Sequence, residues 1–241
     1  MKKVLITGAN KSIGLETAKQ LLQQGYFVYL GSRDKANGEE AVAQLKAEGL
    51  NNVQLLQIDV SNPESVALAA TQIKELDVLI NNAGILGAWE QAPSTAPLSL
   101  IKDVFETNFF GAISVTQSVI DVLKKSVAPR IVNVTSGLGS LTLHSDPAWK
   151  FYQVKGAAYG PSKTALNAYT VHLAYEMKDT AFKINAVDPG YTKTDFNHHN
   201  GLGSVEAAAA IIVKYATLGQ DGPTGKFYSN DIETADQESP W

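Results

Sequence analysis

Short apolar runs alternate with longer amphipathic segments along the whole chain, and this alternation constrains the fold more than any other feature. The expected strands are Lys3–Thr7, Phe27–Gly31, Val53–Ile58, Val78–Asn81, Arg130–Thr135, Lys183–Val187 and Lys226–Ser229. The expected helices lie between them, at Ile13–Gln24, Ala36–Glu48, Pro63–Glu75, Ile101–Lys124, Ser162–Met177 and Val205–Leu218. Strands separated by helices need right-handed crossovers, and near-continuous apolar strands are covered on both faces. The sequence therefore predicts an α/β fold with a doubly wound, seven-stranded, mostly parallel sheet and helices on both faces.

Composition narrows the class of protein further. The chain has 241 residues, of which 44% are apolar and 18% charged, which is enough to bury one large core, and we find no linker or repeat. We expect a single domain over residues 1–241. The net charge of −4 shows no basic excess, so we expect no nucleic-acid or membrane partner. The absence of cysteine excludes disulfides and thiolate metal sites.

Targeting and metal signals are weak. The apolar run that begins at Val4 stops at Thr7-Gly8, too early for a signal peptide, and no stretch has the length of a membrane span. We expect a cytoplasmic protein. His198-His199 has no third ligand nearby, so no metal site is expected.

Polar or turn-forming residues follow the expected strands where each of them ends. They are Thr7-Gly8, Arg33, Asp59, Asn81-Asn82, Ser136 and Pro189-Gly190, after the first six strands in turn. In a doubly wound sheet the carboxyl ends of the strands form the ligand-binding edge. We expect these residues to line one site.

The segment from Thr7 to Gly14 reads T-G-A-N-K-S-I-G and lies between a strand and a helix. Glycines at such a loop let backbone N–H groups approach a pyrophosphate beside the positive end of the helix, although many loops of this kind need glycine for geometry alone. The spacing from Gly8 to Gly14 is one residue longer than in G-x-G-x-x-G. The loop predicts a dinucleotide site of another type.

Residues after the second strand bear on the choice of dinucleotide. An acidic residue there would accept hydrogen bonds from the ribose and repel a 2′-phosphate, but the chain has Gly31-Ser32-Arg33. Arg33 and Lys11 suit a phosphate, although each could be a solvated surface cation, and Asp34 lies one step further on. We interpret this pattern as a preference for NADPH.

Tyr159 and Lys163 are four residues apart, a spacing that places two side chains on one face of a helix. Pro161 between them is tolerated only in a first helical turn, so the pair must lie at a helix start. Such a pair is common by chance. Its weight comes from its combination with the other motifs.

Several motifs occur together in a set order. They are T-G-A-N-K-S-I-G, N-N-A-G at Asn81–Gly84, Asn108 within T-N-F-F-G, Ser136, Tyr159 with Lys163, and Pro189-Gly190 with Thr194. This combination resembles the compact short-chain dehydrogenases/reductases, which have a Rossmann fold. Asn10-Lys11, Ser32-Arg33-Asp34 and the extra residues before Tyr159 are most similar to the carbonyl-reductase branch of that family.

The resemblance implies an oxidoreductase that uses NADP(H) to interconvert a small ketone or aldehyde and its alcohol. It implies that Tyr159 is the general acid and base, that Lys163 stabilises the phenolate and that Ser136 donates to the carbonyl oxygen. Asn108 would bend its helix and hold a water. The implied cofactor-binding residues are Gly8, Asn10, Lys11, Ser12, Ile13, Gly14, Arg33, Asp59, Val60, Asn82, Ala83, Gly84, Tyr159, Lys163, Pro189, Gly190, Thr192 and Thr194.

Ser12 departs from the family pattern, because it replaces the middle glycine of the first loop. Its Cβ could crowd the diphosphate, or its hydroxyl could donate to it. We expect the second, on the assumption that Ser12 adopts the ordinary dihedral angles of a helix start.

The chain also carries extra residues between Ser136 and Tyr159. We expect an apolar pocket there, lined by Leu86, Trp89, Leu141, Leu143, Trp149, Phe151, Tyr152, Tyr191 and Phe196. These residues could equally pack an added helix onto the body of the protein. Relatives usually associate through the long helices that follow Leu100 and Tyr159, and an insertion beside that surface favours a monomer.

Two other functions stay open at this point. One is a regulatory protein that senses NADP without turnover, against which the intact Tyr159, Lys163, Ser136 and Asn108 set argues. The other is an epimerase or dehydratase of the longer family branch, which the first-loop spacing and the lack of a substrate domain disfavour.

Overall fold

The computed structural model describes residues 1–241. Its strands are β1 (Lys3–Ile6), β2 (Phe27–Ser32), β3 (Val53–Gln57), β4 (Val78–Asn81), β5 (Arg130–Val134), β6 (Lys183–Asp188) and β7 (Phe227–Ser229). Its α-helices are α1 (Ser12–Gln23), α2 (Lys35–Ala47), α3 (Pro63–Thr71), α4 (Leu98–Phe105), α5 (Gly111–Leu123), α6 (Leu141–His144), α7 (Tyr159–Glu176) and α8 (Val205–Ala216). Every expected strand is present, within one residue at each end.

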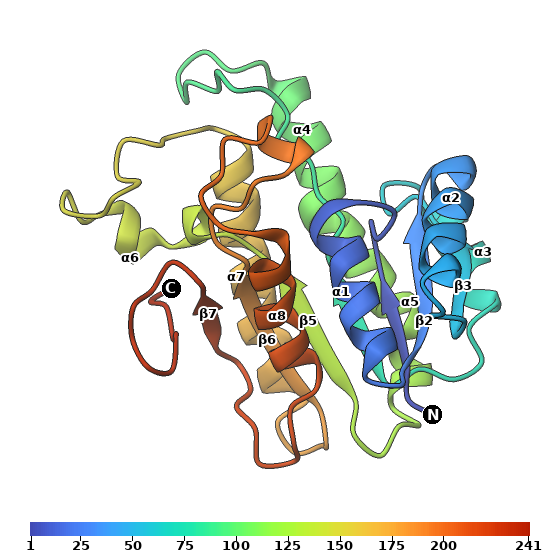
Figure 1. Cartoon of the computed structure of the whole chain (residues 1–241). Helices are drawn as coiled ribbons and strands as arrows, with labels where there is room; N and C mark the ends of the chain where they lie inside the picture. Colours follow the sequence, from blue (N-terminus) through green and yellow to red (C-terminus); the bar gives the residue numbers. More distant parts are fainter.

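The seven strands form one sheet in the order β3-β2-β1-β4-β5-β6-β7, and every pairing is parallel (Figure 1). The doubly wound fold that the sequence predicts is confirmed, with a sheet that is parallel throughout. The strand order reverses between β1 and β4, because the chain crosses from β3 at one edge to β4 on the other side of β1. Ligands bind at such a reversal, outside the carboxyl ends of the strands.

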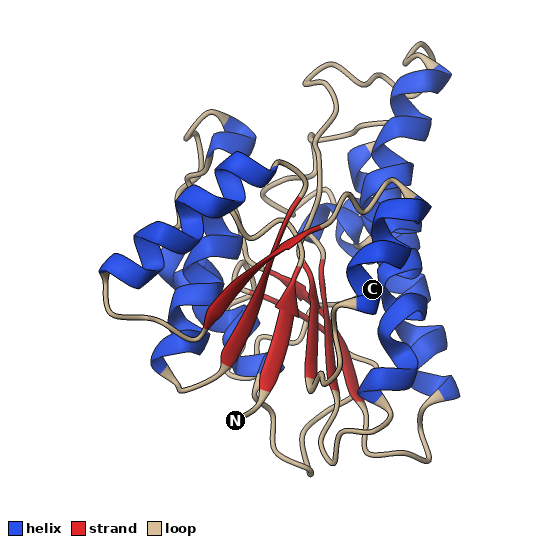
Figure 2. Ribbon diagram, turned by 90° about the vertical axis from the view of Figure 1, so that its right-hand side faces the viewer, coloured by secondary structure: helices blue, strands red, loops and turns tan.

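Helices cover both faces of the sheet (Figure 2). Buried residues of α1, α2 and α8 pack with one side of the sheet in a core cluster of 23 residues. Those of α3, α5 and α7 pack with the other side in a cluster of 19. This arrangement explains why the residues of β1, β4 and β5 are buried without alternation, since both faces of these strands are enclosed. No helix combines the length and apolar character that a membrane crossing requires.

The expected helix over Ile101–Lys124 is broken into three parts. An α-helical stretch, α4, passes into a π-helical segment at Glu106–Phe110, and the regular helix resumes as α5. Apolar periodicity finds the whole span but not the extra residue that a π turn inserts. The helix expected at Ser162 begins three residues earlier, so that Tyr159 is its first residue and Pro161 lies in its first turn.

The extra residues before Tyr159 form the single-turn helix α6 followed by turns. We call residues 141–157 the insertion. The Thr142 N–H donates to the Trp241 carbonyl at 2.9 Å, and the Ser140 hydroxyl donates to the Pro240 carbonyl at 2.7 Å. The insertion therefore lies beside the C-terminal tail, as Figure 1 shows.

Candidate active site

The loop after β1 is held by close backbone contacts. Gly8 has φ +62°, and a Cβ on it would lie 2.9 Å from the Cα of Ala83. A Cβ on Gly14 would lie 2.5 Å from the Gly8 carbonyl oxygen and 2.6 Å from Asn82 Nδ2. Asn82 Nδ2 donates to the carbonyls of Thr7 and Gly8 at 2.9 and 3.0 Å. The N-N-A-G segment therefore buttresses the first loop, and both glycines are required by the packing.

Backbone N–H groups of residues 10 to 14 are left without a protein acceptor, since neither the backbone nor the side-chain hydrogen bonds include them as donors. They lie at the start of α1, where the partial charge of the helix is positive. Donors of this kind fit the diphosphate of a dinucleotide. The predicted binding residues Asn10, Lys11, Ser12, Ile13 and Gly14 share this stretch.

Ser12 is the one residue of this loop whose expected conformation is wrong. Its φ is +50°, in the left-handed region that favours glycine. The sequence interpretation assumed ordinary helix-start dihedral angles, which the first residue of this helix does not adopt. Ser12 therefore adopts a backbone conformation that the glycine of the family pattern would adopt more easily.

The two charged residues that follow β2, Arg33 and Asp34, have different surroundings. The Asp34 carboxylate accepts from the Asn37 N–H at 2.8 Å and caps α2. The Arg33 side chain is exposed at the end of β2. Lys11 Nζ lies 3.2 Å from Asp195 Oδ2, an ion pair between the first loop and the loop after β6. Asp34 is therefore occupied by its helix, while Arg33 remains available to an anion.

Asp59 and Val60, two of the implied cofactor-binding residues, also have structural roles. Asp59 Oδ1 accepts from the N–H and the hydroxyl of Ser61 at 3.0 and 2.7 Å, which closes a turn after β3. Val60 is 8% exposed and packs so tightly on Gly111 that a Cβ there would lie 2.9 Å from Val60 Cγ2. Their contact with the cofactor stays a prediction.

Tyr159, Lys163, Ser136 and Asn108 lie together at the carboxyl edge of β4 and β5. Lys163 Nζ donates to the Val134 carbonyl at 2.9 Å, at the end of β5. A Cβ on Gly84 would lie 3.3 Å from Asn108 Oδ1 and 3.6 Å from Lys163 Nζ. The Lys163 amine and the Asn108 amide therefore both border Gly84.

Tyr159 and Ser136 face each other across this edge. The Ser136 hydroxyl lies close enough to Tyr159 to favour its phenolate form through a hydrogen bond. The same hydroxyl accepts from the Leu138 N–H at 3.2 Å and caps the short 3-10 turn Gly137–Gly139. Ser136 therefore caps a turn and also lies beside Tyr159, as the family resemblance implies. Both side chains are partly exposed, so a substrate can reach them.

Asn108 lies in the middle of the π-helical segment. Its Oδ1 accepts from the Ile85 N–H at 2.8 Å, and its Nδ2 donates to the Ile85 carbonyl at 3.0 Å and to Ser162 Oγ at 3.1 Å. These bonds tie the strand end at β4 to the start of α7. The bend that the family resemblance implies at this residue is present as a π turn. The water that Asn108 would hold stays a prediction.

Burial changes the pKa values of Tyr159 and Lys163. The pKa of the Tyr159 phenol is raised, first by burial and then by the charge of Asp188, while the Ser136 hydrogen bond opposes this. Burial lowers the pKa of Lys163 to about 8, and Asp188 partly restores it. Shifted pKa values such as those of Tyr159 and Lys163 are typical of groups that transfer protons in an active site. The arrangement can donate and recover a proton at the Tyr159 hydroxyl.

The loop after β6 closes one side of the site. Gly190 has φ +81°, and Thr192 and Thr194 are buried, with Asn197 Nδ2 donating to the Thr192 carbonyl at 2.8 Å. The Phe196 ring lies 5.4 Å from the Tyr159 ring, measured between centroids. This loop therefore places an aromatic side chain against the tyrosine.

Aromatic residues of the insertion gather on the opposite side. Trp149 lies 3.5 Å from the position of a Cβ on Gly137, and its ring is 5.5 Å from that of Phe151, which in turn is 5.8 Å from Tyr191. Not every residue expected in the pocket takes part. Leu141 is 64% exposed and Tyr152 lies under the Lys155 amine at 4.2 Å. Ring contacts link Trp149, Phe151 and Tyr191, and Phe196 lies against Tyr159. The pocket itself, with Leu86, Trp89 and Leu143, stays a prediction.

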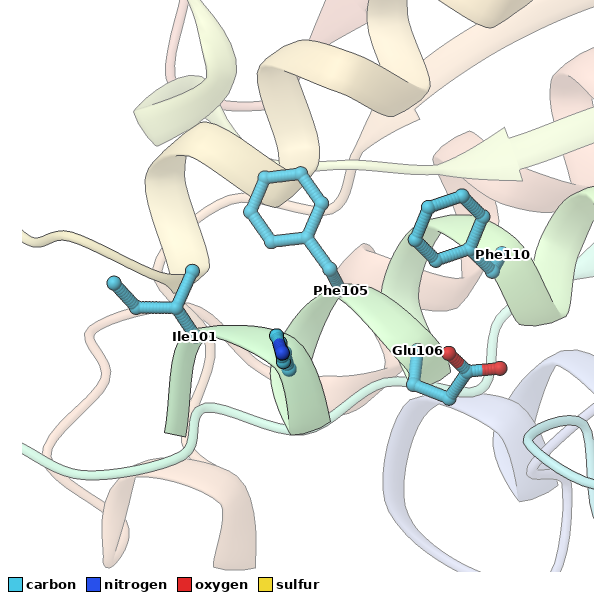
Figure 3. Close-up of a pocket in the computed structure, with 5 residues that line it drawn as sticks. Ile101, Phe105, Glu106 and Phe110 are labelled. Carbon is cyan, nitrogen blue, oxygen red and sulfur yellow. The ribbon is translucent and has the colours of Figure 1, made fainter. Parts of the chain in front are cut away.

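A separate surface pocket of about 330 Å³ lies along α4 and the π-helical segment. It is lined by Ile101, Lys102, Phe105, Glu106 and Phe110, and the two phenylalanine rings flank it (Figure 3). None of the predicted site residues lines this pocket. The polar groups of the predicted site instead meet around Tyr159.

Two residues of the site escaped the sequence interpretation. Gln91 is 6% exposed, and its Oε1 accepts from the N–H groups of Ala158 and Tyr159, both at 3.1 Å, so it fixes the start of α7. Asp188 is 4% exposed and lies at the end of β6. An acid between an apolar strand and Pro189 is an unusual pattern that could have indicated the second residue. No comparable signal marks Gln91.

Comparison with known proteins agrees with this geometry. A family model described as short chain dehydrogenase matches residues 2–203. A (+)-neomenthol dehydrogenase of Arabidopsis thaliana is 35% identical over 282 residues, covering 93% of this chain and 95% of the relative. A (−)-isopiperitenone reductase of Mentha piperita is 34% identical over 307 residues, covering 94% of this chain and 96% of the relative.

Solved structures show the same likeness. Salutaridine reductase from Papaver somniferum superposes with a TM-score of 0.83 at 31% identity, covering 95% of this chain and 99% of that chain. A structure described as ElxO with NADP bound gives a TM-score of 0.79 at 28% identity, covering 95% of this chain and 96% of that one. The motif order, the parallel sheet and these relatives agree. The chain belongs to the short-chain dehydrogenase/reductase family of oxidoreductases.

Proposed function

We propose that this protein is an NADPH-dependent reductase that interconverts a ketone or aldehyde and the corresponding alcohol. The observation that carries the proposal is the meeting of Tyr159, Lys163, Ser136 and Asn108 beside a glycine-rich loop with free N–H groups. Relatives named as a neomenthol dehydrogenase and an isopiperitenone reductase support the substrate class.

The first loop and the loop after β2 would hold the cofactor. The unpaired N–H groups at the start of α1 suit its diphosphate. Arg33 is exposed, and Asp34 is occupied in capping α2, so a 2′-phosphate would meet a cation without a competing free acid. A bound NADP in the ElxO structure supports the same choice. When bound, the cofactor supplies the hydride.

The side chains of this protein manage the proton and the developing charge. Ser136 would donate a hydrogen bond to the carbonyl oxygen, where negative charge grows during reduction. Tyr159 holds its proton firmly because its pKa is raised, so it serves as the acid in reduction. Lys163, fixed on the Val134 carbonyl, places an ammonium near the phenol and stabilises the phenolate once the proton has left. The reverse steps oxidise the alcohol.

The substrate is expected to be apolar or aromatic. Trp149, Phe151 and Tyr191 form a continuous aromatic surface beside Gly137, the neighbour of Ser136. Phe196 lies against Tyr159 from the other direction. A carbonyl that reaches Ser136 and Tyr159 would therefore place its substituents between aromatic rings.

The test follows NADPH absorbance with menthone, acetophenone and acetone. Wild-type protein should oxidise NADPH with at least one of them, and Tyr159→Phe should lose about 10²- to 10⁴-fold in kcat while it still binds NADPH. Tyr175→Phe is the control, because Tyr175 lies on the same helix and is 72% exposed. NADPH binding without turnover would favour a regulatory protein that only senses the cofactor, and equal losses in both variants would contradict the role of Tyr159.

Cofactor choice needs its own measurement. Arg33→Ser should raise the KM for NADPH about tenfold, the worth of one charge-assisted contact, and leave that for NADH unchanged. Lys35→Ser removes a neighbouring cation that instead lies 3.7 Å from Glu39 and should change neither value. A wild-type protein that uses NADH better than NADPH would refute this assignment.

A further inference from the structure

Asp188 ends β6 with its carboxylate inside the protein, 4% exposed. Oδ1 accepts from the Gly190 N–H at 3.0 Å, and Oδ2 accepts from the Ser229 hydroxyl at 2.6 Å. Oδ2 also lies 3.2 Å from the position of a Cβ on Gly137, whose N–H favours the ionised carboxylate. One side chain thus contacts the loop after β5, the loop after β6 and the end of β7.

The sheet brings this carboxylate beside the proton-transfer groups. Val134 pairs with Val187, and the Thr135 N–H donates to the Val187 carbonyl at 2.8 Å, so the end of β5 and the end of β6 run side by side. Lys163 Nζ binds the Val134 carbonyl at that point. Gly137, which meets the carboxylate, directly follows Ser136. Asp188 therefore ends the strand next to the one whose Val134 carbonyl binds Lys163, and its carboxylate contacts the residue that follows Ser136.

No cation neutralises Asp188 directly, since the ion pairs of the structure do not include it. The charged and titratable groups that face it are Tyr159 and Lys163 of α7 and Asp231 after β7, and Asp231 is itself paired with Lys150 at 2.8 Å. Burial raises the pKa of Asp188 to about 6, while its hydrogen-bond donors oppose the shift. The group is therefore ionised at neutral pH, and its charge raises the pKa of both Tyr159 and Lys163.

We propose that Asp188 is a positioning residue of the active site, whose buried carboxylate joins the Ser136 loop to the loop after β6 and sets a fixed negative charge beside Tyr159 and Lys163. The inference rests on the proposed function, because it assumes that these two groups transfer and stabilise the proton. A carboxylate suits the position because every group that contacts it is a donor. An asparagine keeps the shape but must turn its amide toward one of these donors.

The experiment compares the pH profile of kcat for alcohol oxidation by NADP⁺ in four proteins, with 1-phenylethanol and neomenthol as substrates. The proteins are the wild type, Asp188→Asn, Asp188→Ser and Ser229→Ala. Loss of a negative charge weakens proton binding by every group of a coupled cluster. Both neutral replacements of Asp188 should therefore move the apparent pKa of oxidation toward acid, by on the order of one pH unit. Two replacements of different shape separate the charge from the packing.

Ser229→Ala keeps the charge and removes one hydrogen bond of the carboxylate. Its profile above pH 8 should coincide with that of the wild type, even where kcat falls. Neutral variants with a lower kcat but an unmoved profile would show that Asp188 supports the fold only, and would overturn the proposal. Should Asp188→Asn fail to fold, Asp188→Ser gives the same comparison. A wild type without Tyr159-dependent turnover would instead refute the proposed function, which keeps the two failures distinct.

Discussion

Replacing Ser12 by glycine should make the protein more stable and its cofactor complex weaker. With φ at +50°, the serine Cβ meets the carbonyl oxygen of its own backbone, which costs about 1–2 kcal/mol. Glycine removes this cost but gains freedom in the unfolded chain, which returns about 0.4–1 kcal/mol. The net gain of about 1 kcal/mol should raise Tm by about 2–4 °C for a chain of this size.

Ser12→Ala separates the two effects of this residue. Alanine keeps the Cβ, and therefore the strain, but lacks the hydroxyl. We still expect this hydroxyl to donate to the diphosphate, because Ser12 lies among the unpaired N–H groups at the start of α1. Its Tm should match that of the wild type. A hydrogen bond to a charged group is worth about 1.5–3 kcal/mol, so both variants should bind NADPH at least about tenfold more weakly.

The assays are thermal unfolding followed by circular dichroism and a fluorescence titration with NADPH. A Ser12→Gly protein that melts no later than Ser12→Ala would refute the strain argument. Unchanged Kd values in both variants would show instead that the hydroxyl does not reach the diphosphate. The two arguments can therefore fail independently of each other.

Three further substitutions test other parts of the structure. Gly14→Ala would place a Cβ 2.5 Å from the Gly8 carbonyl oxygen and should cost about 1–3 kcal/mol of unfolding free energy in denaturant titrations; an unchanged midpoint would contradict the packing. Burial of Lys163 lowers its pKa to about 8 from 10.5, so between these values the unfolded chain binds the extra proton and stability rises with pH. This rise in the unfolding free energy amounts to about 3 kcal/mol between pH 8 and 10.5, and Lys163→Met should abolish it. An unfolding free energy that changes with pH equally in both proteins would contradict the lowered pKa of Lys163. Trp149→Ala should raise the KM for menthone about tenfold and leave that for acetone unchanged, while Tyr152→Ala should alter neither; an equal effect of Trp149→Ala on both ketones would speak against the aromatic wall.

Elements that a local sequence pattern marks could be predicted from the sequence. All seven strands and the start of α7 near Pro161 follow from apolar runs and from the restricted backbone of proline. The π turn around Asn108 could not be found this way, because the apolar pattern of α4 and α5 is compatible with one continuous helix. The extra residue of the π turn becomes visible only once the positions of α4 and α5 in the fold are known.

Residues of the site divide in the same way. Tyr159, Lys163 and Ser136 belong to motifs that recur in order, so their meeting could be expected before the fold was known. Asp188 and the backbone of Ser12 depend on packing between distant segments, such as the approach of Gly137 to β6, and no local pattern encodes that. The sequence indicates which chemistry is present but not every group that adjusts it.

The ion pair between Lys11 and Asp195 couples the affinity of the first loop for an anion to the position of the loop after β6. An anion that attracts Lys11 competes with Asp195 and loosens the loop that holds Phe196 over Tyr159. By reciprocity, a substrate that displaces Phe196 raises the affinity of Lys11 for that anion by the same factor. Exposed pairs are worth at most about 1 kcal/mol, which limits this cooperativity to about fivefold. The link is weak and symmetric, so it makes the bound cofactor and the bound substrate stabilise each other.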